Sequence, residues 1–199
     1  RHAAGGALLS SSSSYVKNSD QLKRPDLFPA GLPQRTINMT TIGDDLLRPA
    51  SPEFGPRIDA VIVYNSNPVA IAPESSKVAR GFAREDLFTV VLEHFQTDTA
   101  DYADILLPAT TQLEHVDAHA SYGHRYMMAN NAAIAPMGEA KSNAEIFRLL
   151  AKAMGFTEPC FAESDEELAA QAFNYEHERT RHTNWEDLKA KGWSKLQMP

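Results

Sequence analysis

Short, almost wholly apolar runs flank a helical pattern in the middle of the chain. These runs cover residues 58–63 and 87–92, and polar or turn-forming residues bound each of them. An apolar run without alternation is typical of a strand that is buried on both faces, as in a parallel sheet. Between the runs, residues 75–85 bring Val78 and Phe82 to one helical face. The pattern therefore predicts a strand–helix–strand crossover unit.

A third strand and a series of helices are predicted after this unit. The Leu-rich run 103–107 fits a strand that stops at Pro108, because proline cannot continue the hydrogen-bond ladder. Helix starts are marked by S/T-x-x-E capping boxes. Such boxes span residues 142–145, 164–167 and 183–186. The helix after the first box is expected to stop at Gly155, which can adopt a left-handed conformation.

These elements predict an α/β fold, with a partial Rossmann-like parallel sheet, flanking helices and a helical C-terminal tail. We assign residues 1–156 to one α/β domain and residues 157–199 to a helical tail or connector. Residues 1–57 are rich in Gly, Ser and Pro and are expected to be mostly loop. The serine run 10–14 is interpreted as a flexible turn and not as a phosphate loop.

The charge balance restricts the partners of the chain. Its 199 residues hold 19 Lys and Arg against 26 Asp and Glu, a net charge of −7. This balance argues against nucleic acid and anionic membranes as partners. No apolar run approaches the roughly 18 residues of a membrane span, and no signal-peptide pattern is seen, so we predict a soluble, cytoplasmic protein. A lone cysteine, Cys160, excludes an internal disulfide or an iron–sulfur cluster within these residues.

Two loops are the candidate ligand sites, because α/β sheets bind ligands at the C-terminal ends of their strands. These loops cover residues 64–68 and 93–103. Glu93 stands at the tip of the second strand, where nucleotide-binding folds place an acid against ribose hydroxyls. Neither glycine-rich phosphate motif, G-x-G-x-x-G or G-x-x-x-x-G-K-[ST], is present. From the residues alone, a nucleotide site and a solvated loop both remain open.

The histidines offer an alternative. His115 and His119 are spaced i, i+4, which would suit a metal ion if the segment were helical. On such a helix Asp117 would point away from the shared face, and residues 121–123 would end the helix before His124. A metal hydrolase is therefore kept only as an alternative, and no metal ligand is assigned.

Three ordered segments resemble the molybdopterin oxidoreductases of the dimethyl sulfoxide reductase superfamily. The segments are Asn65-Ser66-Asn67-Pro68 after a strand, then Thr97-Asp98-Thr99-Ala100-Asp101-Tyr102-Ala103-Asp104-Ile105-Leu106-Leu107-Pro108, then Leu113-Glu114. The resemblance implies one α/β domain of a longer polypeptide that continues into a C-terminal barrel. It implies molybdopterin guanine dinucleotide as the cofactor, with molybdenum held by residues outside this chain. Two-electron redox chemistry would occur at that metal.

The same resemblance assigns cofactor-binding positions and no catalytic ones. Asn67 and Asn65 would contact the dinucleotide, and the family's strand-end Asp falls on Glu93, directly after Leu92. His115 takes a position that is sometimes Lys, and Asn143 replaces an Asp. The eight candidate residues are Asn65, Asn67, Leu92, Glu93, Thr97, Thr99, His115 and Asn143.

Several questions stay open at this stage. The two threonines, Thr97 and Thr99, could instead cap the turn before Ala103. Glu93 could bind ribose or guanine. The expected partners are the remainder of the polypeptide, electron-transfer subunits and, for the isolated and inactive chain, a second copy. The runner-up is a stand-alone nucleotide-binding or regulatory module without redox activity.

Overall fold

The structure is a computed structural model that describes residues 17–28, 31 and 35–198. The serine run 10–14 lies outside these residues. The chain forms two compact units, which we describe separately. The parallel-sheet unit comprises Gly31–Thr110 and Gly138–Asn143, and the antiparallel-sheet unit comprises Arg1–Ala30, Thr111–Met137 and Ala144–Pro199. The boundary expected after residue 156 concerns the limits of a cofactor-binding domain and stays a prediction.

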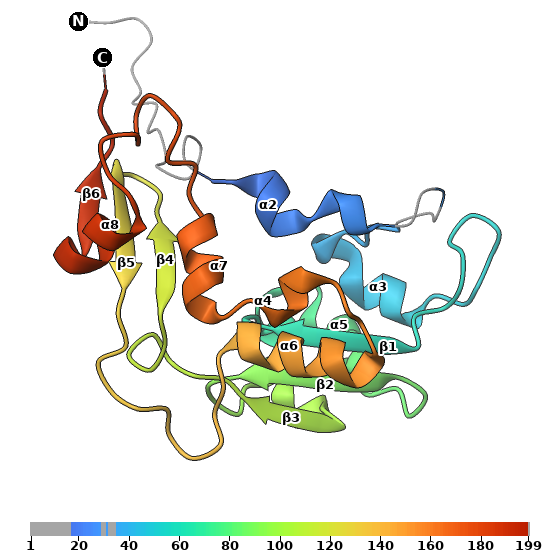
Figure 1. Cartoon of the computed structure of the whole chain (residues 1–199). Coiled ribbons are helices and arrows are strands. Elements are labelled where there is room, and N and C mark those ends of the chain that lie inside the picture. The colour runs from blue at the N-terminus through green and yellow to red at the C-terminus, as the bar shows by residue number, and fades with distance from the viewer. Residues whose placement is uncertain (1–16, 29–30, 32–34, 199) are drawn as a thin grey trace, which may run out of the picture. The chain divides into compact units, whose positions relative to one another are not determined.

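Three parallel strands form the centre of the parallel-sheet unit (Figure 1). They are β1 (Ala60–Tyr64), β2 (Phe88–Glu93) and β3 (Ile105–Pro108), in the order β1-β2-β3. All three predicted strands are confirmed, with bounds shifted by one or two residues. Pro108 is the last residue of β3 and not the stop after it. An isolated parallel bridge between Ala109 and Lys141 continues the pairing beyond β3.

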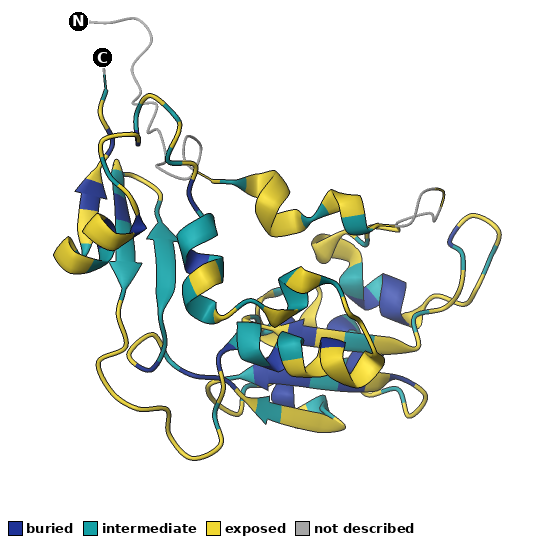
Figure 2. Cartoon of the chain, viewed as in Figure 1, coloured by how far each residue is buried: buried dark blue, intermediate teal, exposed yellow. Residues whose placement is uncertain are grey.

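Helices cover one face of this sheet. The short helices of the unit are η2 (Met39–Thr41), α3 (Ile42–Leu47), α4 (Pro68–Ile71), α5 (Ser75–Phe82) and η3 (Ala100–Tyr102). Leu46 and Val78 from α3 and α5 pack with the paired residues Val63 and Val91 in one hydrophobic core. The predicted burial on both faces is wrong for β1, since Ile62 on its other face is 47% exposed. Most of β3 is exposed as well (Figure 2).

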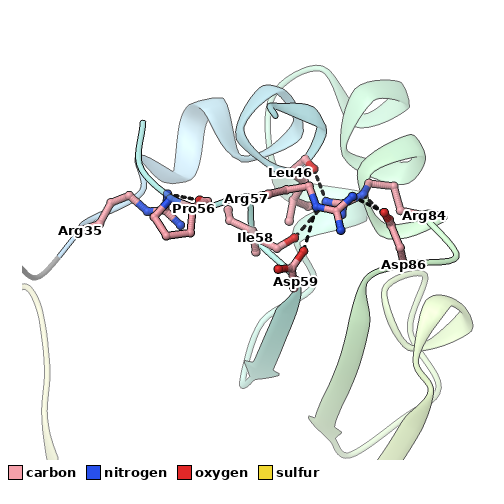
Figure 3. A network of polar contacts seen from close by, with 8 residues as sticks. All are labelled: Arg35, Leu46, Pro56, Arg57, Ile58, Asp59, Arg84 and Asp86. Carbon is pink, nitrogen blue, oxygen red and sulfur yellow. Dashed lines mark hydrogen bonds and ion pairs between the residues drawn. The ribbon is translucent and has the colours of Figure 1, made fainter. Parts of the chain in front are cut away.

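A polar network ties together the amino end of the sheet (Figure 3). Arg84 donates from Nη1 to the carbonyls of Leu46 (2.5 Å) and Ile58 (3.0 Å) and from Nε to Asp86 (2.8 Å). Arg57 also pairs with Asp86. Hydrogen bonds from two arginines lower the pKa of Asp86. The bond from Arg84 has the larger effect, and the bond from Arg57 has the smaller one. The network therefore joins the end of α3 to the segments that enter β1 and β2.

The second unit contains a sheet that the sequence did not predict. Its strands are β4 (Asp117–Ala120), β5 (Tyr126–Asn130) and β6 (Trp193–Lys195), antiparallel and in the order β4-β5-β6. The remaining helices are α2 (Ser19–Lys23), η1 (Pro25–Leu27), α6 (Asn143–Met154), η4 (Pro159–Ala162), α7 (Asp165–Gln171) and α8 (Trp185–Lys191). Met127, Leu188 and Leu196 lie in the core of this unit. The predicted helical tail is confirmed in α7 and α8, but its last part forms β6.

The helix starts test the predicted capping boxes. In the second box, Ser164 accepts from the backbone of Glu167 (3.2 Å), and the Glu167 carboxylate accepts from the backbone of Ser164 (2.7 Å). The third box, at residues 183–186, is wrong. The N-cap there is Asn184, whose side chain accepts from the backbone of Asp187 (2.9 Å). An asparagine caps a helix as well as a threonine does, so the helix begins one residue later.

Candidate functional site

The candidate site is the carboxyl edge of the parallel sheet, defined here as the loops that follow β1 and β2 together with residues 109–110 and 141–143. Parallel strands end at the same edge of a sheet, which is where α/β proteins bind ligands. Lys141 lies against the end of β3, because its amide donates to Pro108 (3.2 Å) and its carbonyl accepts from Thr110 (3.0 Å). This contact brings Asn143 to the same edge.

Asn65 and Leu92 shape the first turn of this edge. Asn65 has a φ of +54, in the left-handed region that asparagine tolerates better than most residues. Its amide donates to the Leu92 carbonyl (3.4 Å), while the Leu92 side chain is only 2% exposed. Leu92 can therefore serve a ligand site through its backbone but not through its side chain.

Asn67 and Thr99 clamp two loops together. Oδ1 of Asn67 accepts from the amide (3.1 Å) and the hydroxyl (2.7 Å) of Thr99, and its Nδ2 donates to Asp98 (3.1 Å). The Thr99 hydroxyl also accepts from the amide of Val69 at the start of α4 (3.0 Å), and Thr99 is fully buried. Both side chains therefore fix the loops that would carry a ligand.

Thr97 and its neighbours hold the loop after β2 in one conformation. The carbonyl of Thr97 accepts from the amide of Asp101 (3.2 Å), and its hydroxyl accepts from the amide of Ala100 (3.4 Å). Gln96 donates to the Asp101 carboxylate (2.8 Å). These bonds form a closed turn before Ala103, in agreement with the capping role considered for Thr97.

Glu93 ends the central strand. Its carbonyl accepts from the amide of Ala109 (3.1 Å), which connects β2 to the loop after β3. Its Oε1 accepts from the amide of His94 (2.8 Å) and lies 3.9 Å from Nδ1 of the same residue. Among the described residues, none donates a hydrogen bond to Oε2. The Glu93 side chain is 14% exposed, and its carboxylate can accept further hydrogen bonds.

Asn143 contributes a second acceptor at this edge. Its Oδ1 is buried and has no hydrogen-bond partner within the part of the chain that the structure describes. Buried polar atoms are almost always paired, so an unpaired one requires an explanation. A ligand N–H or O–H group is one explanation that fits the position of Asn143 at the carboxyl edge.

His115 belongs to the antiparallel-sheet unit, whereas the other seven candidates belong to the parallel-sheet unit. Its Nε2 is 4.0 Å from Oδ2 of Asp117, and Nε2 of His119 is 3.9 Å from the same oxygen. The expectation that Asp117 points away from both histidines is wrong. Asp117 and His119 lie in β4, where alternate residues share a face, and His115 precedes that strand. No group of three metal-ligating side chains within the described ranges is arranged to hold a metal ion. The cofactor role of His115 stays a prediction.

Glu114 is a buried carboxylate. In the sequence it stands out only as the end of the third segment of the family resemblance. It is 7% exposed and accepts from the amide (2.7 Å) and hydroxyl (2.8 Å) of Thr111 and from the amide of Met137 (2.7 Å). The bonds from Thr111 and then from Met137 lower its pKa. Glu114 thus fixes the chain that follows the carboxyl edge.

Several known proteins are similar to this chain in sequence. The family model described as "Molybdopterin oxidoreductase" matches residues 48–153. A Bacillus subtilis protein named "Probable oxidoreductase YoaE" is 45% identical over 87% of this chain and 25% of its own length. The biotin sulfoxide reductase of Cereibacter sphaeroides is 30% identical over 75% of this chain and 21% of its own length. The chain therefore spans a quarter or less of these relatives.

A solved structure shares the fold. The structure of acetylene hydratase from Pelobacter acetylenicus matches 82% of this chain and 21% of its own chain, with a TM-score of 0.63 and 23% identity. No helix of the described residues is long and apolar enough to cross a membrane. The motif resemblance is confirmed by the family model, which covers more than half of the sequence: the chain belongs to the molybdopterin oxidoreductase family.

Proposed function

We propose that this chain binds molybdopterin guanine dinucleotide at the carboxyl edge of its parallel sheet, as part of a longer molybdenum-dependent oxidoreductase. The observation that carries the proposal is a pair of acceptors at this edge, Oε2 of Glu93 and Oδ1 of Asn143, to which no described residue donates a hydrogen bond. The family match supports a molybdenum–pterin cofactor.

The donors of a guanine nucleotide match these acceptors. Guanine presents N1–H and N2–H₂, and the ribose presents hydroxyl groups. Glu93 accepts two such hydrogen bonds without losing its bond from His94, because a carboxylate has about four acceptor sites. Asn143 accepts one. Both acceptors therefore satisfy their hydrogen-bonding capacity when the nucleotide binds.

The residues of this chain supply binding and orientation. When bound, the cofactor supplies two-electron exchange at molybdenum. The clamp of Asn67 and Thr99 holds the loops after β1 and β2 in place before a ligand arrives. Less conformational entropy is then lost on binding, which favours affinity. No residue of the chain is assigned a catalytic step.

The test is a calorimetric titration of the 199-residue chain with guanosine 5′-monophosphate. We expect Glu93→Gln to weaken binding, because hydrogen bonds to a charged acceptor contribute about 1.5–3 kcal/mol each. The amide keeps the shape but loses the charge. Glu85→Gln is the matched control, since Glu85 is exposed and precedes the opposite end of β2. Its affinity should equal that of the wild type.

The contradicting results are equally specific. Absence of binding by the wild-type chain at millimolar nucleotide would refute the proposed site. Equal affinity of the wild type and Glu93→Gln would exclude the carboxylate as an anchor. Weakening by Glu85→Gln to the same extent would show that the effect follows net charge and not position.

A further inference from the structure

Phe95 is an exposed aromatic ring beside the candidate anchor. It follows Glu93 by two residues, in the loop that leaves the central strand, and it is 74% exposed. Its described ring contact is an edge-to-face arrangement with its neighbour His94, at 6.3 Å between centroids. Exposing an aromatic ring forgoes the burial that stabilises such side chains elsewhere in the fold.

Hydrogen bonds restrain the loop that follows Phe95 and so oppose a rearrangement that would bury its ring. The four residues that follow it are all held by hydrogen bonds: Gln96 to Asp101, Thr97 to Ala100, and both Asp98 and Thr99 to Asn67. Thr99 is fully buried as well. Phe95 is therefore presented to solvent by a rigid loop, which is the arrangement expected of a preformed contact for a ligand.

A second phenylalanine on the same strand shows that exposure alone is not the signal. Phe88 is 48% exposed, but it begins β2 at the opposite end, where Arg84 and Asp86 are already paired. At the carboxyl edge, Phe95 follows by two residues Glu93, whose Oε2 receives no hydrogen bond from any described residue. A ligand that satisfies both groups needs a flat π-face together with hydrogen-bond donors. A nucleobase attached to ribose has both.

We propose that Phe95 is the surface on which the guanine base of the bound dinucleotide stacks. This inference rests on the proposed function and deepens it by naming the residue that binds the face of the base. Glu93 takes the donors of the ribose or of the base edge, and Phe95 takes the ring. Stacking on an aromatic side chain contributes to nucleobase affinity without requiring a particular base. The base then gains affinity from Phe95 and selectivity from the acceptors.

The experiment compares two probes that differ in the base, guanosine 5′-monophosphate and ribose 5-phosphate. Both are titrated into the wild type, Phe95→Leu, Phe95→Trp and Phe88→Leu. We expect Phe95→Leu to weaken guanosine 5′-monophosphate binding about tenfold and to leave ribose 5-phosphate binding unchanged. Phe95→Trp should retain nucleotide affinity because it retains a π-face. Phe88→Leu should bind like the wild type.

Three results would overturn the inference. If Phe95→Leu binds the nucleotide as tightly as the wild type, no stacking occurs, and another segment of the protein covers the ring. If both probes weaken equally, the substitution has disturbed the loop. If Phe88→Leu weakens nucleotide binding as much as Phe95→Leu does, the effect does not depend on the position of the ring at the carboxyl edge. Failure of the wild type to bind the nucleotide would refute the proposed function itself, a result distinct from the first three.

Discussion

The two edges of the parallel sheet differ in which polar groups are paired. At the amino edge, Arg84 and Arg57 connect Asp86 to the backbone of α3 and of the segment that enters β1 (Figure 3). At the carboxyl edge, Oε2 of Glu93 and Oδ1 of Asn143 have no donor among the described residues. The same three strands end in both places, so the difference comes from the loops.

This difference distinguishes polar groups that stabilise the sheet from polar groups that are available to a ligand. The pairs at the amino edge connect segments that must meet for the sheet to form. The buried Oδ1 of Asn143 at the carboxyl edge costs stability while it is unpaired, since an unpaired buried acceptor costs about 1–3 kcal/mol. Departures from complete pairing are expected where a protein keeps groups for a ligand. The amino edge has two exceptions of its own, Nη2 of Arg84 and Oγ1 of Thr89, which are buried and have no hydrogen-bond partner among the described residues.

The largest expected effect on stability is that of Arg84→Met. The substitution leaves the carbonyls of Leu46 and Ile58 without their donor, so we expect unfolding free energy to fall by about 1–3 kcal/mol in urea denaturation. Nucleotide affinity of the folded variant should not change. Arg80→Met is the control, since Arg80 is exposed on α5, and it should shift stability by less than about 0.5 kcal/mol. If both variants were equally stable, the hydrogen bonds of Arg84 at the amino edge would not contribute to the stability of the fold.

A smaller effect is expected from the pH dependence of Glu114. Its folded pKa is lowered by the bonds from Thr111 and Met137, so its stabilising contribution is present above the ordinary glutamate pKa. That contribution is lost as pH falls through the lowered value. Unfolding midpoints measured from pH 6 to pH 3 should therefore decline less steeply in Glu114→Gln than in the wild type. Parallel declines would mean that Glu114 contributes nothing to acid sensitivity.

The sequence predicted the parallel sheet well because its signal is local. Apolar runs bounded by turn formers define β1 and β2, and β-branched residues such as Val63 and Val91 favour strands. The antiparallel sheet lacks such a signal. β4 consists of Asp, Ala and His, and β6 has three residues and pairs with a strand more than sixty positions earlier. Pairing of this kind depends on tertiary contacts that no local pattern encodes.

The sequence leads to a candidate site at the strand ends, but not to the contacts within it. A carboxylate directly after a buried strand indicated Glu93, and the order of three motifs indicated the family. The clamp of Asn67 and Thr99 joins residues 32 positions apart, so it appears only once the loops meet. The unpaired Oδ1 of Asn143 likewise depends on what surrounds it. Phe95 was overlooked because an apolar residue in sequence carries no indication that it will be exposed.

The most direct test of the carboxyl-edge site is hydrogen–deuterium exchange of the chain with and without guanosine 5′-monophosphate. We expect the nucleotide to slow amide exchange in residues 93–99 and 141–145, where the acceptors and the rigid loop lie. Exchange in residues 57–59 and 84–88, at the amino edge, should not change. Protection confined to the amino edge, or no protection under conditions that saturate binding, would contradict the assignment of the carboxyl edge as the nucleotide site.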